Sequence, residues 1–174
     1  MLRSTILLFV VIHSLTSGAQ KYTTAAGIRL GSGIGVTVQQ SIGGNNTIEG
    51  IIQKSFFSDY TQVSALFQQH HGVLSRGTNF YLGAGPQIGV YGNSGKTEGI
   101  KDAFGISVIG GLEMKLGKTV LSFDYKPSIN LSGGTSFLDS QAGFSLRYVL
   151  IKAAKREHKW MFWKKRKNTK NEDD

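Results

Sequence analysis

Three groups of residues in this chain have types that could do chemistry, and the first is a glycine-rich stretch. Gly95-Lys96-Thr97 matches the end of the phosphate-binding motif Gly-x-x-x-x-Gly-Lys-[Ser/Thr]. The motif requires a further glycine at position 90, where the sequence has Val90. From Phe104 onward the pattern predicts a strand, whereas the motif is followed by a helix. We therefore interpret the stretch as an exposed loop.

The second group is the pair His70-His71, which could bind a metal or act as a general base. Adjacent residues of a strand point to opposite faces, and no acid or further histidine stands near them in the sequence. We predict a solvated pair at the end of a strand. No pattern of Ser, His and acid of the kind needed by outer-membrane lipases can be identified either. The sequence therefore predicts no enzyme activity, catalytic residue, metal or cofactor.

The third group consists of charged residues that alternate with apolar ones and share a face with Gly, Ser and Gln. Its members are Arg29, Glu49, Glu113, Lys115, Asp124, Lys126 and Arg147. Glu113 and Asp124 flank a predicted tight turn and could be a carboxylate pair for glycoside hydrolysis. Because Lys115 and Lys126 fall on the same face, we interpret the group as a salt-bridge lining. An unpaired buried charge is costly, so we predict that the seven form a structural charge network inside the fold.

The elements that carry these residues are predicted to be β-strands, because apolar and polar residues alternate with a period of two. Phe104, Ile106 and Val108 show the pattern most clearly. The expected strands cover residues 23–31, 33–42, 47–56, 60–70, 79–91, two strands between 103 and 131 joined at 117–118, and 141–151. Counting Gly31-Ser32-Gly33 as a hairpin gives eight strands, the even number typical of bacterial membrane barrels; without it there are seven.

The alternation alone leaves open which row of side chains faces inward. The polar row carries Gly, Ser and Gln rather than the Lys and Glu of a solvated surface, which favours a tight polar interior and a lipid-facing apolar row. We expect aromatic side chains near the strand ends of the apolar row to form interfacial girdles, namely Phe56, Tyr60, Phe80, Tyr125 and Tyr148. The alternative is a secreted or periplasmic soluble β-barrel that binds a small apolar ligand.

The N-terminus has the features of an export signal. Arg3 precedes a short apolar run at residues 6–12, and Ser17-Gly18-Ala19 offers small residues at the cleavage position. We predict a signal peptide over residues 1–19, a β-barrel domain over 20–151 and a basic periplasmic tail over 152–174; a retained N-terminal anchor is the alternative. The chain has no cysteine, so neither a lipoprotein anchor nor a disulfide can form.

The net charge of +9 is concentrated in the tail, which carries +5 between residues 152 and 174. The high pI therefore describes the tail, and we expect no nucleic-acid partner. Trp160, Phe162 and Trp163 alternate with basic residues there, as in interfacial segments. We predict that the tail lies at the periplasmic membrane surface or contacts the cell wall; a solvated overhang is the alternative.

Four segments carry a family resemblance: FYLGAGPQIGVYG (residues 80–92), GISVIGGLEMKL (105–116), VLSFDYKPSINL (120–131) and AGFSLRYVL (142–150). They resemble small outer-membrane β-barrel proteins of the Bacteroidetes type, similar to the eight-stranded membrane domain of outer-membrane protein A. The resemblance implies an all-β, eight-stranded antiparallel up-and-down transmembrane β-barrel in the outer membrane of a Gram-negative bacterium. It also implies insertion by the barrel-assembly machinery, which reads a terminal strand ending in an aromatic residue. Here Tyr148 and Leu150 end the last strand, and the tail follows.

These observations lead to one functional expectation. An eight-stranded barrel is just filled by its own side chains, so we expect no large pore. With outer-membrane lipid as its surroundings, the protein would have a structural role in the envelope. Alternatively, it would bind a ligand through the loops at residues 92–102 and 132–140.

Overall fold

The computed structural model describes residues 22–73, 77–92 and 101–152, and this part of the chain is built from eight strands. They are β1 (Tyr22–Gly31), β2 (Gly33–Gly43), β3 (Asn46–Ser55), β4 (Tyr60–Gly72), β5 (Thr78–Tyr91), β6 (Ala103–Leu116), β7 (Thr119–Ser132) and β8 (Leu138–Lys152). No helix in this part is long and apolar enough to cross a membrane. The predicted signal peptide, the Gly95-Lys96-Thr97 stretch and residues 153–174 of the predicted tail lie outside the described residues.

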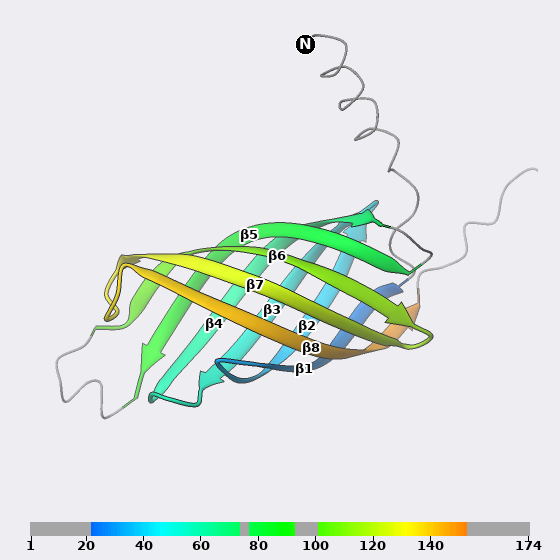
Figure 1. The fold of residues 1–174 in the computed structure, drawn as a ribbon. Helices are drawn as coiled ribbons and strands as arrows, with labels where there is room; N and C mark the ends of the chain where they lie inside the picture. Colours follow the sequence, from blue (N-terminus) through cyan, green and yellow to red (C-terminus); the bar gives the residue numbers. More distant parts are fainter. Residues whose placement is uncertain (1–21, 74–76, 93–100, 153–174) are drawn as a thin grey trace, which may run out of the picture.

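The strands form a closed barrel in which each pairs antiparallel with its neighbours in sequence and β8 returns to β1. Figure 1 shows the strands wrapping obliquely around the barrel axis. The predicted eight-stranded antiparallel up-and-down barrel is thereby confirmed. The break at Gly31-Ser32-Gly33 is a hairpin, because Leu30 of β1 pairs with Ile34 of β2.

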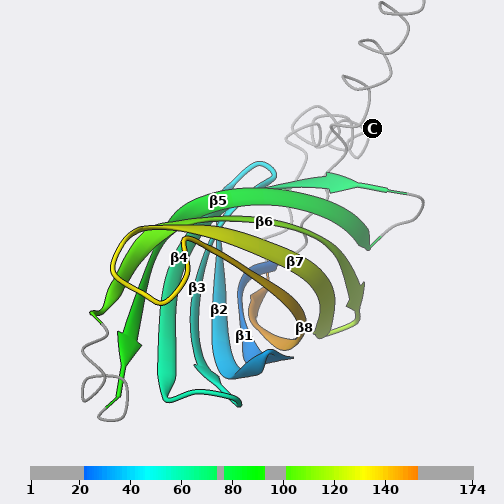
Figure 2. The same ribbon diagram turned by 60° about the vertical axis from the view of Figure 1, so that its left-hand side comes forward.

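The barrel has two distinct ends. At the terminal end, β1 begins, β8 ends, and short turns join β2 to β3, β4 to β5 and β6 to β7. At the loop end lie the β1–β2 hairpin, residues 56–59, and the connections after β5 and β7. Figure 2 shows the β7–β8 connection, in yellow, projecting from this end of the curved sheet. We use these two names below.

Side chains alternate between an apolar outer face and a polar inner face in every strand. On β6, for example, Val108 is 50% exposed while the neighbouring Ser107 and Ile109 are completely buried. The outer face carries Ile, Val, Leu and Phe over its whole height. The inner face buries Arg, Lys, Glu, Asp, Gln and Ser, with few large apolar groups.

One predicted girdle residue is on the wrong face. Tyr60 lies in the inward row of β4 with Gln62, and its hydroxyl is 3.5 Å from Gln62 Nε2. Its ring crosses Gly89 on β5, where an added Cβ would lie 2.1 Å from the Tyr60 hydroxyl oxygen. Phe56, by contrast, lies in the turn that precedes β4 and is 58% exposed. The turn at residues 56–59 interrupts the alternation, so Tyr60 shares the inward row of Gln62 although Phe56, four residues earlier, points outward.

Candidate functional site: a filled lumen below a polar vestibule

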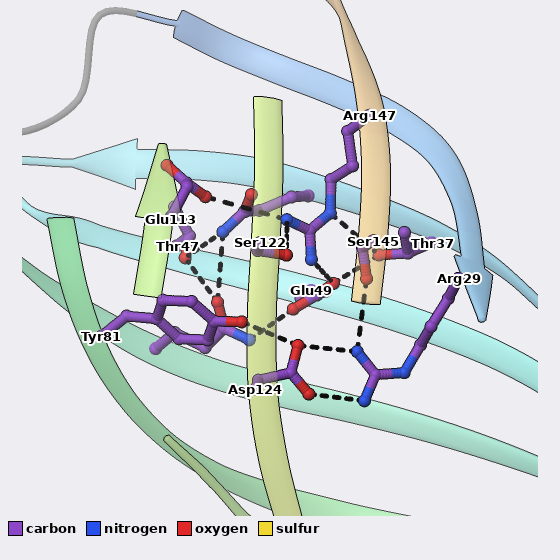
Figure 3. Close-up of polar contacts among 12 residues, drawn as sticks. Arg29, Thr37, Thr47, Glu49, Tyr81, Glu113, Ser122, Asp124, Ser145 and Arg147 are labelled. Carbon is purple, nitrogen blue, oxygen red and sulfur yellow. Dashed lines mark hydrogen bonds and ion pairs between the residues drawn. The ribbon is translucent and has the colours of Figure 1, made fainter. Parts of the chain in front are cut away.

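The lower tier of the lumen, near the terminal end, is centred on an ion pair between Arg147 of β8 and Glu49 of β3. Figure 3 shows the Arg147 guanidinium reaching across the lumen to this carboxylate. Thr37 and Gln68 also donate hydrogen bonds to Glu49. Arg147 further donates to Ser122 at 3.0 Å, and its Nη1 lies 3.8 Å from Glu113 Oε2. Both charges are fully buried and thus depend on these partners.

His70 belongs to this tier, which corrects the prediction that His70-His71 is a solvated pair. Its side chain is completely buried, and its ring stacks on Tyr81 with centroids 5.2 Å apart. Its Nε2 lies 3.1 Å from Gln39 Nε2 and 3.0 Å from Thr47 Oγ1. The two rings point to opposite faces as expected, but β4 continues past His70 to Gly72 and His70 lies in its inward row, so its ring is buried in the lumen.

The middle tier is a two-bonded ion pair between Arg29 of β1 and Asp124 of β7. Arg29 Nη1 and Nη2 donate to the two carboxylate oxygens at 2.8 and 2.5 Å, and both side chains are fully buried. The Tyr81 hydroxyl donates to the same carboxylate at 2.9 Å. Arg29 also donates to Gln53 Oε1 at 3.2 Å. Gly143 makes room for the guanidinium, because an added Cβ there would lie 2.2 Å from Arg29 Nη2.

The upper tier, toward the loop end, is centred on Lys126, which is fully buried and donates to neutral groups. Its ammonium lies 2.6 Å from Gln62 Oε1 and 3.1 Å from Ser64 Oγ. Gln62 donates in turn to Gln87, and Gln87 donates to Asn130 at 3.2 Å. The four residues around the β6–β7 turn were interpreted as one salt-bridge lining. In the structure Asp124 binds Arg29, Glu113 lies near Arg147, and Lys115 stands partly exposed at the terminal end.

Two clusters of apolar side chains also pack inside the lumen. Ile51, Leu66 and Ile109 pack with Tyr81, and a smaller cluster of Ala25, Val120 and Val149 lies toward the terminal end. The fully buried charges balance, since three cations (Arg29, Lys126 and Arg147) accompany three carboxylates (Glu49, Glu113 and Asp124). Each carboxylate accepts bonds from neighbouring side chains. This arrangement stabilises a closed barrel, and within the described residues no three His, Asp or Glu side chains converge as metal ligands.

Above the upper tier the lumen widens into a cavity of about 610 Å³, which we call the vestibule. Most of the residues that line it have polar side chains, among them Gln53, Gln62, Asn130 and Gln141. The sequence analysis did not identify it. Its residues come from five strands and three connections between strands, and no local pattern signals that they meet.

The comparisons with known proteins bear on the fold. No family model matches the sequence, and no curated protein matches it. Among solved structures the chain is similar to the N-terminal β-barrel domain of Pseudomonas aeruginosa OprF, with a TM-score of 0.55 and 10% identity over 74% of this chain and 98% of that one. Neisserial surface protein A aligns with a TM-score of 0.48 and 14% identity, over 72% of this chain and 94% of that one. At this identity the OprF likeness establishes the barrel fold alone.

Proposed function

We propose that the chain is an outer-membrane β-barrel protein without a solute pore, which serves the envelope structurally or binds a ligand at its loop end. The observation that carries the proposal is the inverted polarity of the barrel. Large apolar side chains cover its outside, while its charged and amide side chains are buried inside. A soluble monomer rarely exposes a contiguous apolar patch larger than about 300–600 Å².

Strand length supports the same proposal. The strands have 10 to 15 residues, and a tilted strand needs about 9–11 residues to cross a bilayer. The short turns at the terminal end and the longer connections after β5 and β7 match the usual asymmetry of bacterial barrels. We therefore place the terminal end in the periplasm and the loop end outside the cell.

The alternative, a soluble barrel with an apolar ligand inside, requires an apolar lumen. The described lumen instead holds three fully buried cations and three carboxylates. The open space above these tiers is the vestibule at the loop end, whose lining residues are mostly polar. The likeness to the OprF domain concerns the fold alone, so the outer-membrane assignment rests on the polarity of this chain. Insertion by the barrel-assembly machinery, through β8 and Tyr148, follows as part of the proposal.

Cell fractionation without detergent, followed by gel migration of unboiled and boiled samples, tests the location and the closed barrel. We expect the protein in the outer-membrane fraction, with a mobility that changes on boiling. Recovery in the soluble fraction with unchanged migration would contradict the proposal.

Planar-bilayer recording tests the absence of a pore. A general porin reconstituted at the same protein-to-lipid ratio serves as the positive control. We expect no large, stable conductance steps from this protein, because three tiers of buried side chains cross the lumen. Stable steps comparable to those of the porin would show that the lumen is open.

A further inference from the structure

The vestibule is a cavity of ligand size with rigid walls. Its volume of about 610 Å³ lies within the range of about 300–1,000 Å³ that is usual for small-molecule sites. Three amides of its wall are fixed from below. Gln53 accepts from Arg29, Gln62 accepts from Lys126, and Asn130 accepts from Gln87. The buried tiers therefore hold the floor and walls of the vestibule in place before any ligand arrives.

The wall offers both donors and acceptors to a ligand. Gln53 is only 4% exposed and uses its Oε1 for Arg29, and no described residue accepts a hydrogen bond from its Nε2. Gln141 is 8% exposed, and its Oε1 has no hydrogen-bond partner among the described residues. Gln141 Oε1 is itself a buried atom, and a buried polar atom without a partner costs free energy that a ligand can recover. A ligand rich in hydroxyl groups can satisfy both atoms, because each hydroxyl donates and accepts.

An aromatic surface lies at the mouth of the same cavity. The rings of Tyr60 and Tyr91 stand 4.8 Å apart at 44°. The Tyr60 ring packs directly on the backbone of Gly89, and the Tyr91 hydroxyl lies 3.5 Å from Thr135 Oγ1. A ring with an apolar face and a polar edge packs well on a ligand that is itself apolar on one face and hydroxylated at its rim.

The charge of the wall favours neutral over anionic ligands. Asp59 and Asp139 line the vestibule, and no lysine, arginine or histidine is among its described lining residues. Asp59 is partly neutralised by Lys54, whose ammonium lies 3.6 Å away. The remaining carboxylate, Asp139, accepts from the Ser140 backbone N–H at 2.8 Å and can still accept from a neutral hydroxyl.

From these observations we propose that the vestibule is a binding site for a neutral saccharide. The sugar ring would stack on Tyr60 and Tyr91, and its hydroxyl groups would bind Gln53, Gln141 and Asp139. The ligand would be either a free oligosaccharide or a sugar segment of the cell's own surface polysaccharide. The proposal rests on the proposed outer-membrane function in one respect: that function places the loop end outside the cell, so the sugar would arrive from there.

Calorimetric titration of the full chain in a zwitterionic detergent tests the site, since a sugar-headed detergent would compete. The probes are short neutral oligomers of glucose, mannose, galactose and N-acetylglucosamine, and delipidated surface polysaccharide of the source cells. We expect saturable binding of at least one neutral saccharide. Competition between the two kinds of probe identifies the cell's own polysaccharide as a source, and binding of the free oligomers alone identifies an external sugar.

Matched variants separate the vestibule from the rest of the barrel. Tyr91→Ala should weaken binding about tenfold or more, because it removes half of the stacking surface. Tyr125→Ala removes the same atoms from the outer face, where Tyr125 is 54% exposed, and should leave affinity unchanged. Asp139→Asn keeps an acceptor, so binding of a neutral sugar should fall by less than about fivefold.

Three results would overturn the proposal. The first is failure of every neutral saccharide to bind a sample that still shows heat-modifiable migration. The second is binding of spermidine or choline instead, abolished by Asp139→Asn, which would identify a cation site. The third is equal binding of acidic and neutral sugars. Failure of the outer-membrane proposal would appear in fractionation and leave binding in detergent unaffected.

Discussion

Replacement of Asp124 by asparagine removes one charge from the middle tier with almost no change in shape. Arg29 would lose its carboxylate partner while remaining fully buried, and an amide oxygen can replace only one of the two accepting oxygens. Removing one partner of a buried ion pair costs about 3–5 kcal/mol. The Tyr81 hydroxyl, 2.9 Å from the same carboxylate, loses a charge-assisted bond as well, so we expect the upper part of that range.

The free energy of unfolding can be measured by urea titration of the protein in lipid vesicles. Unboiled gel migration is the suitable signal, because both tryptophans, Trp160 and Trp163, follow β8 in the sequence and neither belongs to a strand of the barrel. The matched control is Asp59→Asn, which makes the same chemical change in an exposed ion pair with Lys54. Exposed pairs contribute about 0–1 kcal/mol, so the control should unfold nearly as the natural protein does.

The double variant Arg29→Met, Asp124→Asn completes the experiment. Because Arg29→Met removes the charge that Asp124→Asn leaves without a partner, the double variant should recover part of the loss. Compared with both single variants, it should give a coupling energy of about 1–3 kcal/mol. The reasoning would be refuted if Asp124→Asn cost no more than Asp59→Asn at an unchanged dependence on urea. That result would mean that water reaches Arg29, and the lumen would then not be filled as described.

Two further substitutions test the lipid-facing surface and the close packing of the lumen. Val108→Arg, at the middle of β6 and facing outward, should destabilise the protein in vesicles by about 2–4 kcal/mol. The control Phe137→Arg, in the exposed β7–β8 connection, should be almost neutral. Equal effects of the two substitutions in urea titration would contradict a lipid-facing outer row. Gly143→Ala should displace Arg29 and lower the free energy of unfolding by about 1–3 kcal/mol. In the control Gly50→Ala the added Cβ would meet nothing within 4 Å, so stability should change by less than about 1 kcal/mol. A loss at Gly50 as large as that at Gly143 would show that crowding of Arg29 does not cause the loss at Gly143.

The sequence was sufficient to predict the barrel because each strand repeats a single physical rule. Exposed apolar side chains such as Val108 alternate with buried ones such as Ser107, and the alternation indicates a strand and sorts its residues onto two faces. The Gly, Ser and Gln of the polar row then indicated that this row faces the interior. The hairpin at Gly31-Ser32-Gly33 could be placed because an even strand number requires it. All seven charged residues of the predicted network fall in the inward rows for the same reason, although Lys115 stands partly exposed near the terminal end.

The partners of these charges could not be predicted, because they depend on how far each strand is displaced along its neighbours. Glu113 and Asp124 are close in sequence, yet their partners come from β8 and β1 respectively. The alternation fixes the face of a residue and carries no information on its height in the lumen. For the same reason the sequence did not indicate how deeply His70 is buried or that Tyr60 contacts Tyr91 at the loop end.

The two ion pairs across the lumen have a consequence for the order in which the barrel can assemble. Arg29 and Asp124 are separated by 95 residues and Glu49 and Arg147 by 98, and neither pair joins adjacent strands. No hairpin that forms alone can therefore make either of these two ion pairs. Contacts between such distant residues come late, since loop closure must precede them. A chain that ends before β8 would leave Glu49 without Arg147, so the last strand supplies both the seam of the sheet and the counter-charge. We therefore expect closure of β1 onto β8 and neutralisation of the lumen to be one cooperative event.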